Sequence, residues 1–333
     1  MIAIHKASGG FSDRWISYCD SNAISYKIVN CYENDIISQL SDCSALMWQY
    51  YQGSIKDFIM AKALMNALEI IGIKSFPDFK TAWHFDDKVG QKYLLEAIGA
   101  PLASTWVFYN KLEALDWVAK ADFPKVFKLR GGAGSQNVRL VNNRKQARKL
   151  VRKAFGRGFP TYDAVRSLRE RWRLYRLGKT NFRDLLEGFA RLFIVPPYSR
   201  VKGPERGYIY FQEYIAGNDS DIRVIVIDDK AFGIKRMVRK GDFTASGSGN
   251  ILYDKVLIDE GIVKLSFEIA EKLKTQCVAF DFVQMGNKPL VVEISYGFSP
   301  AGYDPCPGYW DKEMNWHEGR FNPYGWIVEM MII

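Results

Sequence analysis

Two acidic residues, Asp281 and Glu293, each lie inside an apolar stretch with the composition of a β-strand. The stretches VAFDFV and PLVVEIS flank a short polar turn, so we predict a hairpin that sets the two carboxylates side by side. An ionised carboxylate within an apolar sheet is costly unless a cation neutralises it. Carboxylate oxygens suit Mg²⁺, which takes further ligands from water and nucleotide phosphates. The alternative is an edge hairpin whose acidic side chains reach solvent.

A second segment that could take part in chemistry is the glycine-rich run KVFKLRGGAGSQNVRLV at residues 125–141. Its pattern predicts a strand, a turn and a second strand. Glycines in the turn allow backbone N–H groups to approach an anion closely. Lys128 lies in the strand before the turn, where its ammonium could reach the same anion. An ordinary surface turn is the alternative.

The composition is that of a globular chain with a substantial core. The sequence has 333 residues, of which 48% are hydrophobic and 25% charged, enough for two or three subdomains. Five widely spaced cysteines without a CxxC pair favour reduced thiols over a disulfide framework or a zinc site. The N-terminal residues lack a signal-peptide core, and no apolar run is long enough to cross a bilayer. We therefore expect a cytoplasmic protein.

Positive charge is concentrated in one segment. Residues 144–206 contain 18 Lys and Arg against 5 Asp and Glu, whereas the net charge of the whole chain is +9. Apolar residues at helical spacing predict helices over residues 163–177 and 181–193, within a basic insertion at 152–206. Its surface could be the solvated face of a packed hairpin, a contact for an anionic membrane, or a binding surface for an acidic substrate. Nucleic acid is not expected, because no recognition motif is present.

The remaining elements position these groups. Residues 1–82 have the pattern of a small α/β unit, and Asp86 is predicted to cap a helix that ends at Gly99. The strand-like runs YIYFQEYI, DIRVIVI and AFGIKRMV then follow the insertion. A predicted helix at residues 259–274 leads into the carboxylate hairpin.

The order of these parts resembles the ATP-grasp superfamily, and within it the carboxylate–amine ligases, which include ribosomal-protein glutamate ligases and D-alanine–D-alanine ligase. The resemblance spans residues 86–300 and rests on the strand lysine, the glycine turn, the QEYI run, the D-I-R strand, the GDF turn and the final D…E-I-S. It implies an α/β (α+β) ATP-grasp fold with a small N-terminal α/β domain at 1–82 and an ATP-grasp domain at 83–333. Within the latter, a lid subdomain at about 101–210 would contain the insertion, and a metal-binding subdomain would occupy about 211–333.

The resemblance also implies a nucleotide site. Two lysines would contact phosphates, the glycine turn would close over them, the QEYI run would bind adenine through its backbone, and an acid would bind the ribose. The positions are Lys88, Lys128, Gly132, Ala133, Gly134, Ser135, Gln212, Glu213, Tyr214, Ile215 and Asp219, with Asp221 as the alternative ribose ligand.

The metal and catalytic positions follow in the same way. Asp281 and Glu293 match the magnesium ligands of the superfamily, and Ser295 stands where many relatives carry a ligating Asn. Arg223 and Arg236, together with Lys128, match basic groups that face phosphate and acyl phosphate. The implied cofactors are ATP and Mg²⁺.

The activity implied is ATP-dependent ligation of a carboxylate to an amine through an acyl phosphate. The EISYGFSP run and the CPGYW loop are similar to ATP-grasp proteins associated with bacterial surface polysaccharide, which suggests an amino acid or amine joined to a sugar carboxylate. The alternatives are a small-molecule kinase of the ATP-grasp type, or a catalytically silent nucleotide-binding protein that docks on membrane. Docking on membrane, whether by such a protein or through the basic insertion of a ligase, would place the protein at the periphery of the inner membrane.

Overall fold

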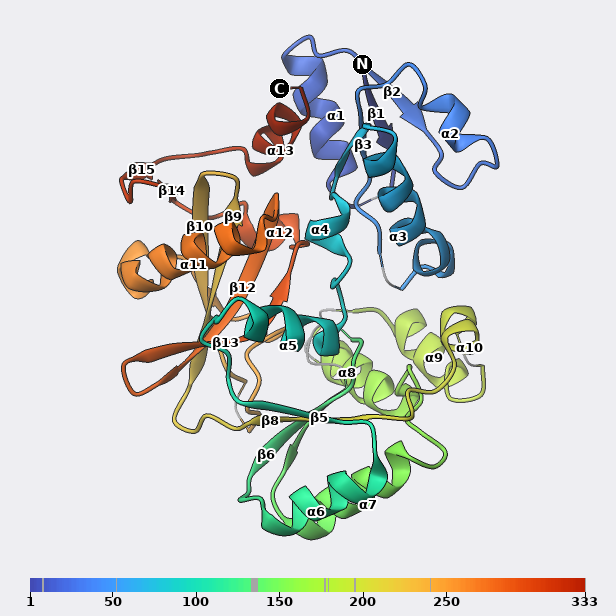
Figure 1. Ribbon diagram of the computed structural model, residues 1–333, viewed down its shortest axis with the longest axis vertical. Helices are drawn as coiled ribbons and strands as arrows, with labels where there is room; N and C mark the ends of the chain where they lie inside the picture. Colours follow the sequence, from blue (N-terminus) through green and yellow to red (C-terminus); the bar gives the residue numbers. More distant parts are fainter. Residues whose placement is uncertain are drawn as a thin grey trace. The chain divides into compact units, whose positions relative to one another are not determined.

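The computed structural model describes residues 1–7, 9–51, 53–132, 137–176, 178, 180–194, 196–239 and 241–332 (Figure 1). The chain forms two compact units. The first unit comprises Met1–Ala103 and Ile215–Ile333, and the second comprises Ser104–Tyr214. The predicted domain boundary near residue 82 lies inside the first unit and stays a prediction.

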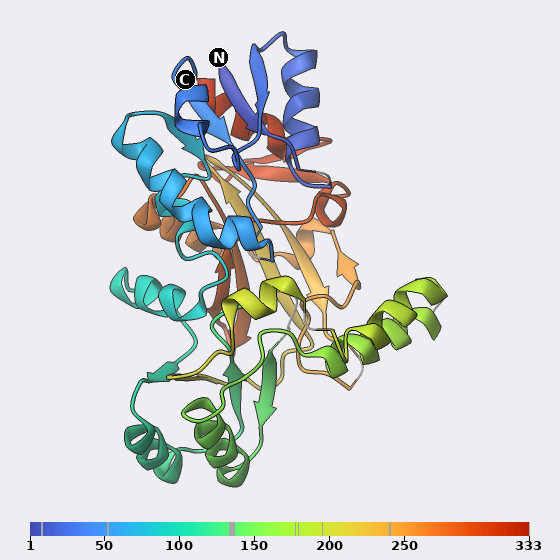
Figure 2. The ribbon, with the colours of Figure 1, turned by 90° about the vertical axis from the view of Figure 1, so that its right-hand side faces the viewer.

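The first unit begins with a four-stranded parallel sheet in the order β2-β1-β3-β4. Parallel neighbours need crossover connections, and helices alternate with these strands as the sequence predicts. The C-terminal helix α13 packs against α1, so the two termini lie close together (Figures 1 and 2). The elements are β1 (Ile2–His5), α1 (Ser12–Ser21), β2 (Tyr26–Val29), α2 (Ile36–Gln39), β3 (Ala45–Met47), α3 (Ile55–Ile70), β4 (Lys74–Phe76), α4 (Phe79–Ala82) and α13 (Pro323–Ile332).

A larger antiparallel sheet in the same unit has the order β13-β12-β9-β10-β14-β15, with β11 beside β10. Alternate residues of β9 enter two separate apolar cores: Val224 packs in the core that includes α11, and Ile225 packs in the core of the parallel sheet. The elements are α5 (Lys88–Ala97), β9 (Ser220–Ile227), β10 (Lys230–Met237), β11 (Ile251–Leu252), a 3₁₀ turn (Lys255–Leu257), α11 (Glu260–Leu273), β12 (Cys277–Met285), β13 (Lys288–Ser295), α12 (Pro300–Tyr303), β14 (Gly308–Asp311) and β15 (Trp316–Glu318).

Helix α5 starts one residue later than predicted. The side chain of Asp87, not Asp86, accepts the hydrogen bond from the backbone N–H of Gly90, at 3.0 Å. Asp86 instead adopts a left-handed conformation with φ +53°. Either acid of an Asp-Asp pair satisfies the sequence pattern of an N-cap, so backbone conformation decides between them. As a result, Lys88 is the first helical residue.

The second unit is built on an antiparallel sheet in the order β5-β8-β6-β7. Helices α6 and α7 cover one face, where Phe127 and Phe211 of the sheet pack among Val118 and Val151 of the helices. The predicted hairpin around the glycine turn is present, with Lys128 paired to Val138. The elements are β5 (Thr105–Phe108), α6 (Lys111–Lys120), β6 (Lys125–Lys128), β7 (Val138–Val141), α7 (Arg144–Ala154), α8 (Ala164–Arg176), α9 (Phe182–Ala190), α10 (Pro197–Lys202) and β8 (Ile209–Glu213).

The basic insertion is helical, as predicted. Helices α8 and α9 pack against each other, and the small residue Gly188 allows this approach because a Cβ there would lie 3.0 Å from Leu168 and 2.9 Å from Arg171. Across the described part of the chain, no helix combines the length and hydropathy needed to span a bilayer.

Candidate active site

A row of charged side chains crosses the large sheet of the first unit. Asp281 of β12 lies directly opposite Glu293 of β13 and opposite Arg223 of β9. Neighbouring strands present directly opposed residues on the same face, so these three side chains share one face of the sheet. The hairpin predicted from the sequence therefore does bring the two carboxylates together. A register shift after Asp281 marks a β-bulge, a feature that often re-aims a side chain near a functional site.

Two arginines hold the carboxylate of Asp281. Its Oδ1 lies 3.3 Å from Nη1 of Arg223, and its Oδ2 lies 2.9 Å from Nη2 of Arg236. Arg236 also donates two hydrogen bonds to Asp221, from Nε at 2.6 Å and from Nη2 at 2.7 Å. Asp281 is only 6% exposed, so the alternative of an acid that reaches solvent is wrong for this residue.

Lys88 completes the cluster from the first turn of α5. Its Nζ lies 3.0 Å from Oε1 of Glu293, and the lysine is buried. Burial acts to lower the pKa of Lys88, but the neighbouring charges of Glu293, Asp86 and Asp281 outweigh it and raise the pKa. The ammonium is therefore charged at neutral pH.

Burial and the neighbouring charges also act in opposite directions on the pKa values of Arg223, Arg236 and Asp221. Burial lowers the pKa of Arg223 and of Arg236, yet Asp281 beside them raises both pKa values, so both guanidinium groups stay charged. Burial raises the pKa of Asp221 to about 6, against the hydrogen bonds from Arg236, and the nearby charge of Asp281 adds to the rise. The cluster thus combines the three cationic side chains Lys88, Arg223 and Arg236 with the carboxyl groups of Asp221, Asp281 and Glu293.

This balance refines the reasoning from sequence. Asp281, which is buried, and Glu293, whose side chain is 30% exposed, both have cationic partners, and protein side chains supply them. Within the described ranges, no group of three or more His, Cys, Asp or Glu side chains is arranged to hold a metal ion. Asp281 and Glu293 are two adjacent hard-oxygen donors, which suits Mg²⁺ where nucleotide phosphates and water provide the other ligands.

Ser295 lies on the same face as Glu293, two residues along β13, and opposite Ala279. Its hydroxyl donates to the carbonyl oxygen of Gly297 at 3.0 Å and accepts from the Gly297 N–H at 3.1 Å. The hydroxyl thus closes the turn after β13, and its predicted role as a metal ligand stays a prediction.

The other predicted positions lie mostly in the second unit. Lys128 is buried at the end of β6, between β7 and β8. Gly132 has φ +123°, a conformation that favours glycine. Ala133, Gly134 and Ser135 lie outside the described residues.

The QEYI run spans the end of β8. Gln212 is buried, and its amide donates to Thr105 at 3.1 Å. Glu213 forms an ion pair with Lys125 at 2.7 Å, an interaction that the sequence reasoning missed. Since β8 ends at Glu213, the backbone of Tyr214 and Ile215 lies beyond the sheet.

The structure distinguishes the two candidate ribose ligands in the first unit. Both carboxylate oxygens of Asp221 accept hydrogen bonds from Arg236. Asp219 is exposed, and its side chain accepts a hydrogen bond from the neighbouring Ser220 at 2.8 Å. Asp219 is therefore the more accessible of the two acids.

Residues 201–300, which contain the charged row except for Lys88, match the profile of the RimK-like ATP-grasp domain. The chain has an ATP-grasp fold. The fold expected from the sequence motifs is thus confirmed, and residues 201–300 match a domain of the superfamily that the motifs resemble. No curated protein sequence matches the chain significantly.

Solved structures agree on the fold over the whole chain. The chain is similar to a RimK-domain ATP-grasp protein from Sphaerobacter thermophilus, with a TM-score of 0.58, 14% identity and coverage of 100% of this chain and 99% of the other. It is also similar to D-alanine–D-alanine ligase from Bacillus anthracis in complex with ATP, with a TM-score of 0.57, 14% identity and coverage of 99% and 95%. A third similar structure is D-cycloserine synthetase DcsG, with a TM-score of 0.59, 14% identity and coverage of 99% of both chains.

Proposed function

We propose that this ATP-grasp protein is an ATP-dependent ligase that joins a carboxylate to an amine. The observation that carries the proposal is the charged row of Asp281, Glu293, Arg223 and Arg236, completed by Lys88, in which all but the partly exposed Glu293 are largely buried. Structures of similar fold include enzymes named for ligation, D-alanine–D-alanine ligase and D-cycloserine synthetase. The proposed cofactors are ATP and Mg²⁺.

The cluster suits the first step, in which a carboxylate oxygen attacks the γ-phosphorus of ATP and the bond to the β–γ bridging oxygen breaks. Both reactants are anions, so cations must offset their repulsion. Arg223 and Arg236 are held in place by Asp281 and Asp221, which balance their charge, so the guanidinium groups would offer N–H donors to phosphate oxygens without reorganising during the reaction. Asp281 and Glu293 would hold Mg²⁺, which when bound neutralises phosphate charge.

The second step forms the amide. The amine nitrogen attacks the acyl carbon, inorganic phosphate leaves, and the nitrogen loses a proton. Because the acyl phosphate is readily hydrolysed, the site must limit water. The roles of Lys128, of residues 132–135 and of the QEYI backbone in nucleotide binding stay part of the proposal.

Product analysis tests this function. The full chain is incubated with Mg²⁺, ATP and mixtures of sugar acids or amino acids with amines, and ADP, phosphate and amide are measured. A ligase releases ADP and phosphate and forms amide only when both substrates are present. ADP with a stable phosphorylated product and no need for amine would instead establish the kinase, and no turnover with any mixture would favour the silent binding protein.

The substrate proposal is narrower. A sugar carboxylate as acceptor, in surface polysaccharide synthesis, is supported only by the similarity of the EISYGFSP and CPGYW segments noted in the sequence. In the same assay, uronic acids should then give faster ADP release than free amino acids as the carboxylate. Equal or slower release with uronic acids would contradict this assignment.

We also propose that the helical insertion contacts an anionic membrane surface. Large apolar side chains on α8, α9 and the segment after α9 are exposed, among them Trp172 at 50% and Phe193 at 88%. Exposed arginines accompany them, including Arg169, Arg176 and Arg183. Exposed apolar side chains beside cationic ones suit a negatively charged lipid interface. The apolar stripe predicted on residues 163–177 is therefore present but largely unburied.

Sedimentation with vesicles tests the membrane proposal. Vesicles of phosphatidylglycerol and phosphatidylcholine should bind the chain more strongly than pure phosphatidylcholine. Phe193→Ser should weaken binding about tenfold or more, because burial of an aromatic side chain is lost. The control is Val256→Ser, which removes a side chain that is 82% exposed outside the insertion. Equal effects of the two substitutions, or no binding of the unmodified chain, would contradict the proposal.

A further inference from the structure

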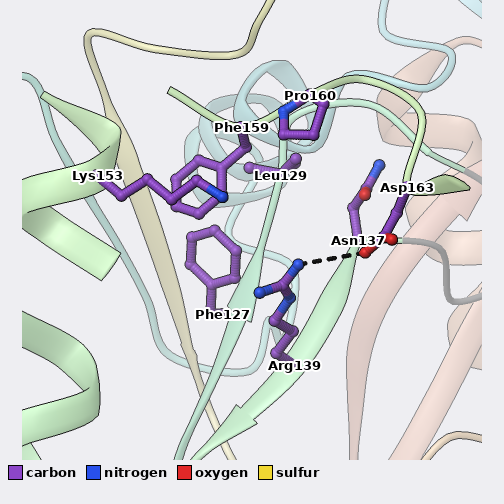
Figure 3. A pocket seen from close by; sticks show the side chains of 8 residues that line it. All are labelled: Phe127, Leu129, Asn137, Arg139, Lys153, Phe159, Pro160 and Asp163. Atoms are coloured by element: carbon purple, nitrogen blue, oxygen red, sulfur yellow. Dashed lines mark hydrogen bonds and ion pairs between the residues drawn. The ribbon is translucent and has the colours of Figure 1, made fainter. Parts of the chain in front are cut away.

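The second unit contains a cavity that the proposed ligase chemistry does not use. Its volume is about 170 Å³. Apolar side chains line one part and charged or polar side chains the rest (Figure 3). The lining residues are Phe127, Leu129, Asn137, Arg139, Lys153, Phe159, Pro160 and Asp163.

The cavity lies on the opposite face of the sheet from Lys128. Successive residues of a strand point to opposite faces, so Phe127 and Lys128 in β6 are directed apart. Phe127 packs in the core formed with α6 and α7, and Arg139 lies directly opposite it on β7. A ligand in the cavity would therefore occupy a site distinct from the predicted phosphate contact.

Charge in the cavity favours a single anion. Arg139 and Lys153 both extend into it, and Asp163 pairs with Arg139 at 3.4 Å (Figure 3). The charged lining thus has two cations and one carboxylate, an excess of one positive charge. Burial, with the nearby charges of Arg139 and Arg157, lowers the pKa of Lys153. An anion beside Lys153 would relieve this repulsion.

The apolar part of the cavity determines the size and the apolar character of the part of the ligand that it would contact. Phe127, Leu129 and Phe159 are almost fully buried, and Nζ of Lys153 lies 4.7 Å from the centroid of the Phe159 ring. An engineered apolar cavity of about 150 Å³ in another protein binds benzene. A cavity of about 170 Å³ is therefore large enough for one ring or a short branched chain.

We propose that this cavity binds a small monocarboxylate that carries an aromatic ring or a branched aliphatic chain. Its carboxylate contacts the ammonium of Lys153 and shares the guanidinium of Arg139 with Asp163. Its apolar body packs against Phe127, Leu129 and Phe159. Binding requires neither ATP nor turnover, so this site and the ligase function can be tested independently of each other.

Calorimetry with benzoate tests the site on the full chain without nucleotide. Benzoate should bind saturably, and benzamide, its neutral analogue of the same shape, should bind at least about tenfold more weakly because the charge-assisted contact is lost. Lys153→Met should weaken benzoate binding by a similar factor. Lys149→Met is the matched control, because Lys149 lies one turn earlier on α7, is exposed and does not line the cavity.

A second readout separates binding from a loss of folding. The pKa of Lys153, followed by NMR after reductive ¹³C-methylation, should rise when benzoate is added, because an anion stabilises the protonated amine. The thermal unfolding of Lys153→Met should match that of the unmodified chain. Equal affinity for benzoate and benzamide, equal affinity of Lys153→Met and the unmodified chain, or no saturable binding would overturn the proposal.

Discussion

Replacing Asp281 with Asn should destabilise the first unit substantially. Asp281 is buried and contacts Arg223 at 3.3 Å and Arg236 at 2.9 Å. Removing one partner from a buried ion pair typically costs about 3–5 kcal/mol, because the remaining charge is left uncompensated. Arg236 retains both hydrogen bonds to Asp221, so we expect a loss near 3 kcal/mol, at the lower end.

Urea unfolding at pH 7, without Mg²⁺ or nucleotide, measures this loss. The control is Asp229→Asn, which removes an exposed acid that pairs with Lys230 and should cost less than about 0.5 kcal/mol. Arg223→Met in the Asp281→Asn background restores the charge balance and should recover part of the loss. A cost for Asp281→Asn below about 1 kcal/mol, or no recovery in the double variant, would refute the reasoning that the carboxylate neutralises these arginines.

Three further substitutions test individual interactions. Burial lowers the pKa of His84 to about 4, whereas an unfolded histidine titrates near a pKa of about 6.5. The unfolded chain therefore takes up the proton first as the pH falls. The free energy of unfolding should decrease by about 3 kcal/mol between pH 7 and pH 4 for this reason. His84→Phe should lose this part of the pH dependence. The free energies of unfolding of the variant and of the unmodified chain are measured at pH 7 and at pH 4, and the gap between the two proteins should change by about 3 kcal/mol. A gap that is the same at both pH values would contradict the prediction. Asp87→Ala should lower the free energy of unfolding by about 1 kcal/mol through loss of the helix cap, whereas no change in urea unfolding would argue against the cap. Lys125→Met should destabilise the second unit by about 1–3 kcal/mol, since Glu213 loses its ion-pair partner at 2.7 Å. Thermal unfolding of the full chain should show a lower unfolding temperature for residues 104–214. An unchanged unfolding temperature would count against this pair.

The sequence predicted what depends on local pattern. The apolar runs around Asp281 and Glu293 differ in composition from the turn between them, so the hairpin and its opposed carboxylates were predictable. The same holds for the strand with Lys128 and for the two helices of the insertion, whose apolar residues recur at helical spacing.

The ion pairs were not predictable, because they depend on register between distant segments. The contact of Arg223 with Asp281 requires β9 and β12 to be neighbours in one particular alignment. The pair of Lys125 and Glu213 requires the same of β6 and β8. For this reason the sequence indicated buried acids that need cations and named Mg²⁺, whereas the structure shows that arginine and lysine provide the first neutralisation.

Calorimetric titration of the full chain with ATP, in the presence and absence of Mg²⁺, tests the central claim most directly. If Asp281 and Glu293 hold the metal of a metal–nucleotide complex, ATP binds tightly only with Mg²⁺, and Glu293→Gln weakens that binding at least about tenfold while binding without Mg²⁺ stays weak. ATP binding of equal strength with and without Mg²⁺, or unchanged Mg²⁺-dependent binding in Glu293→Gln, would contradict the assignment of this pair.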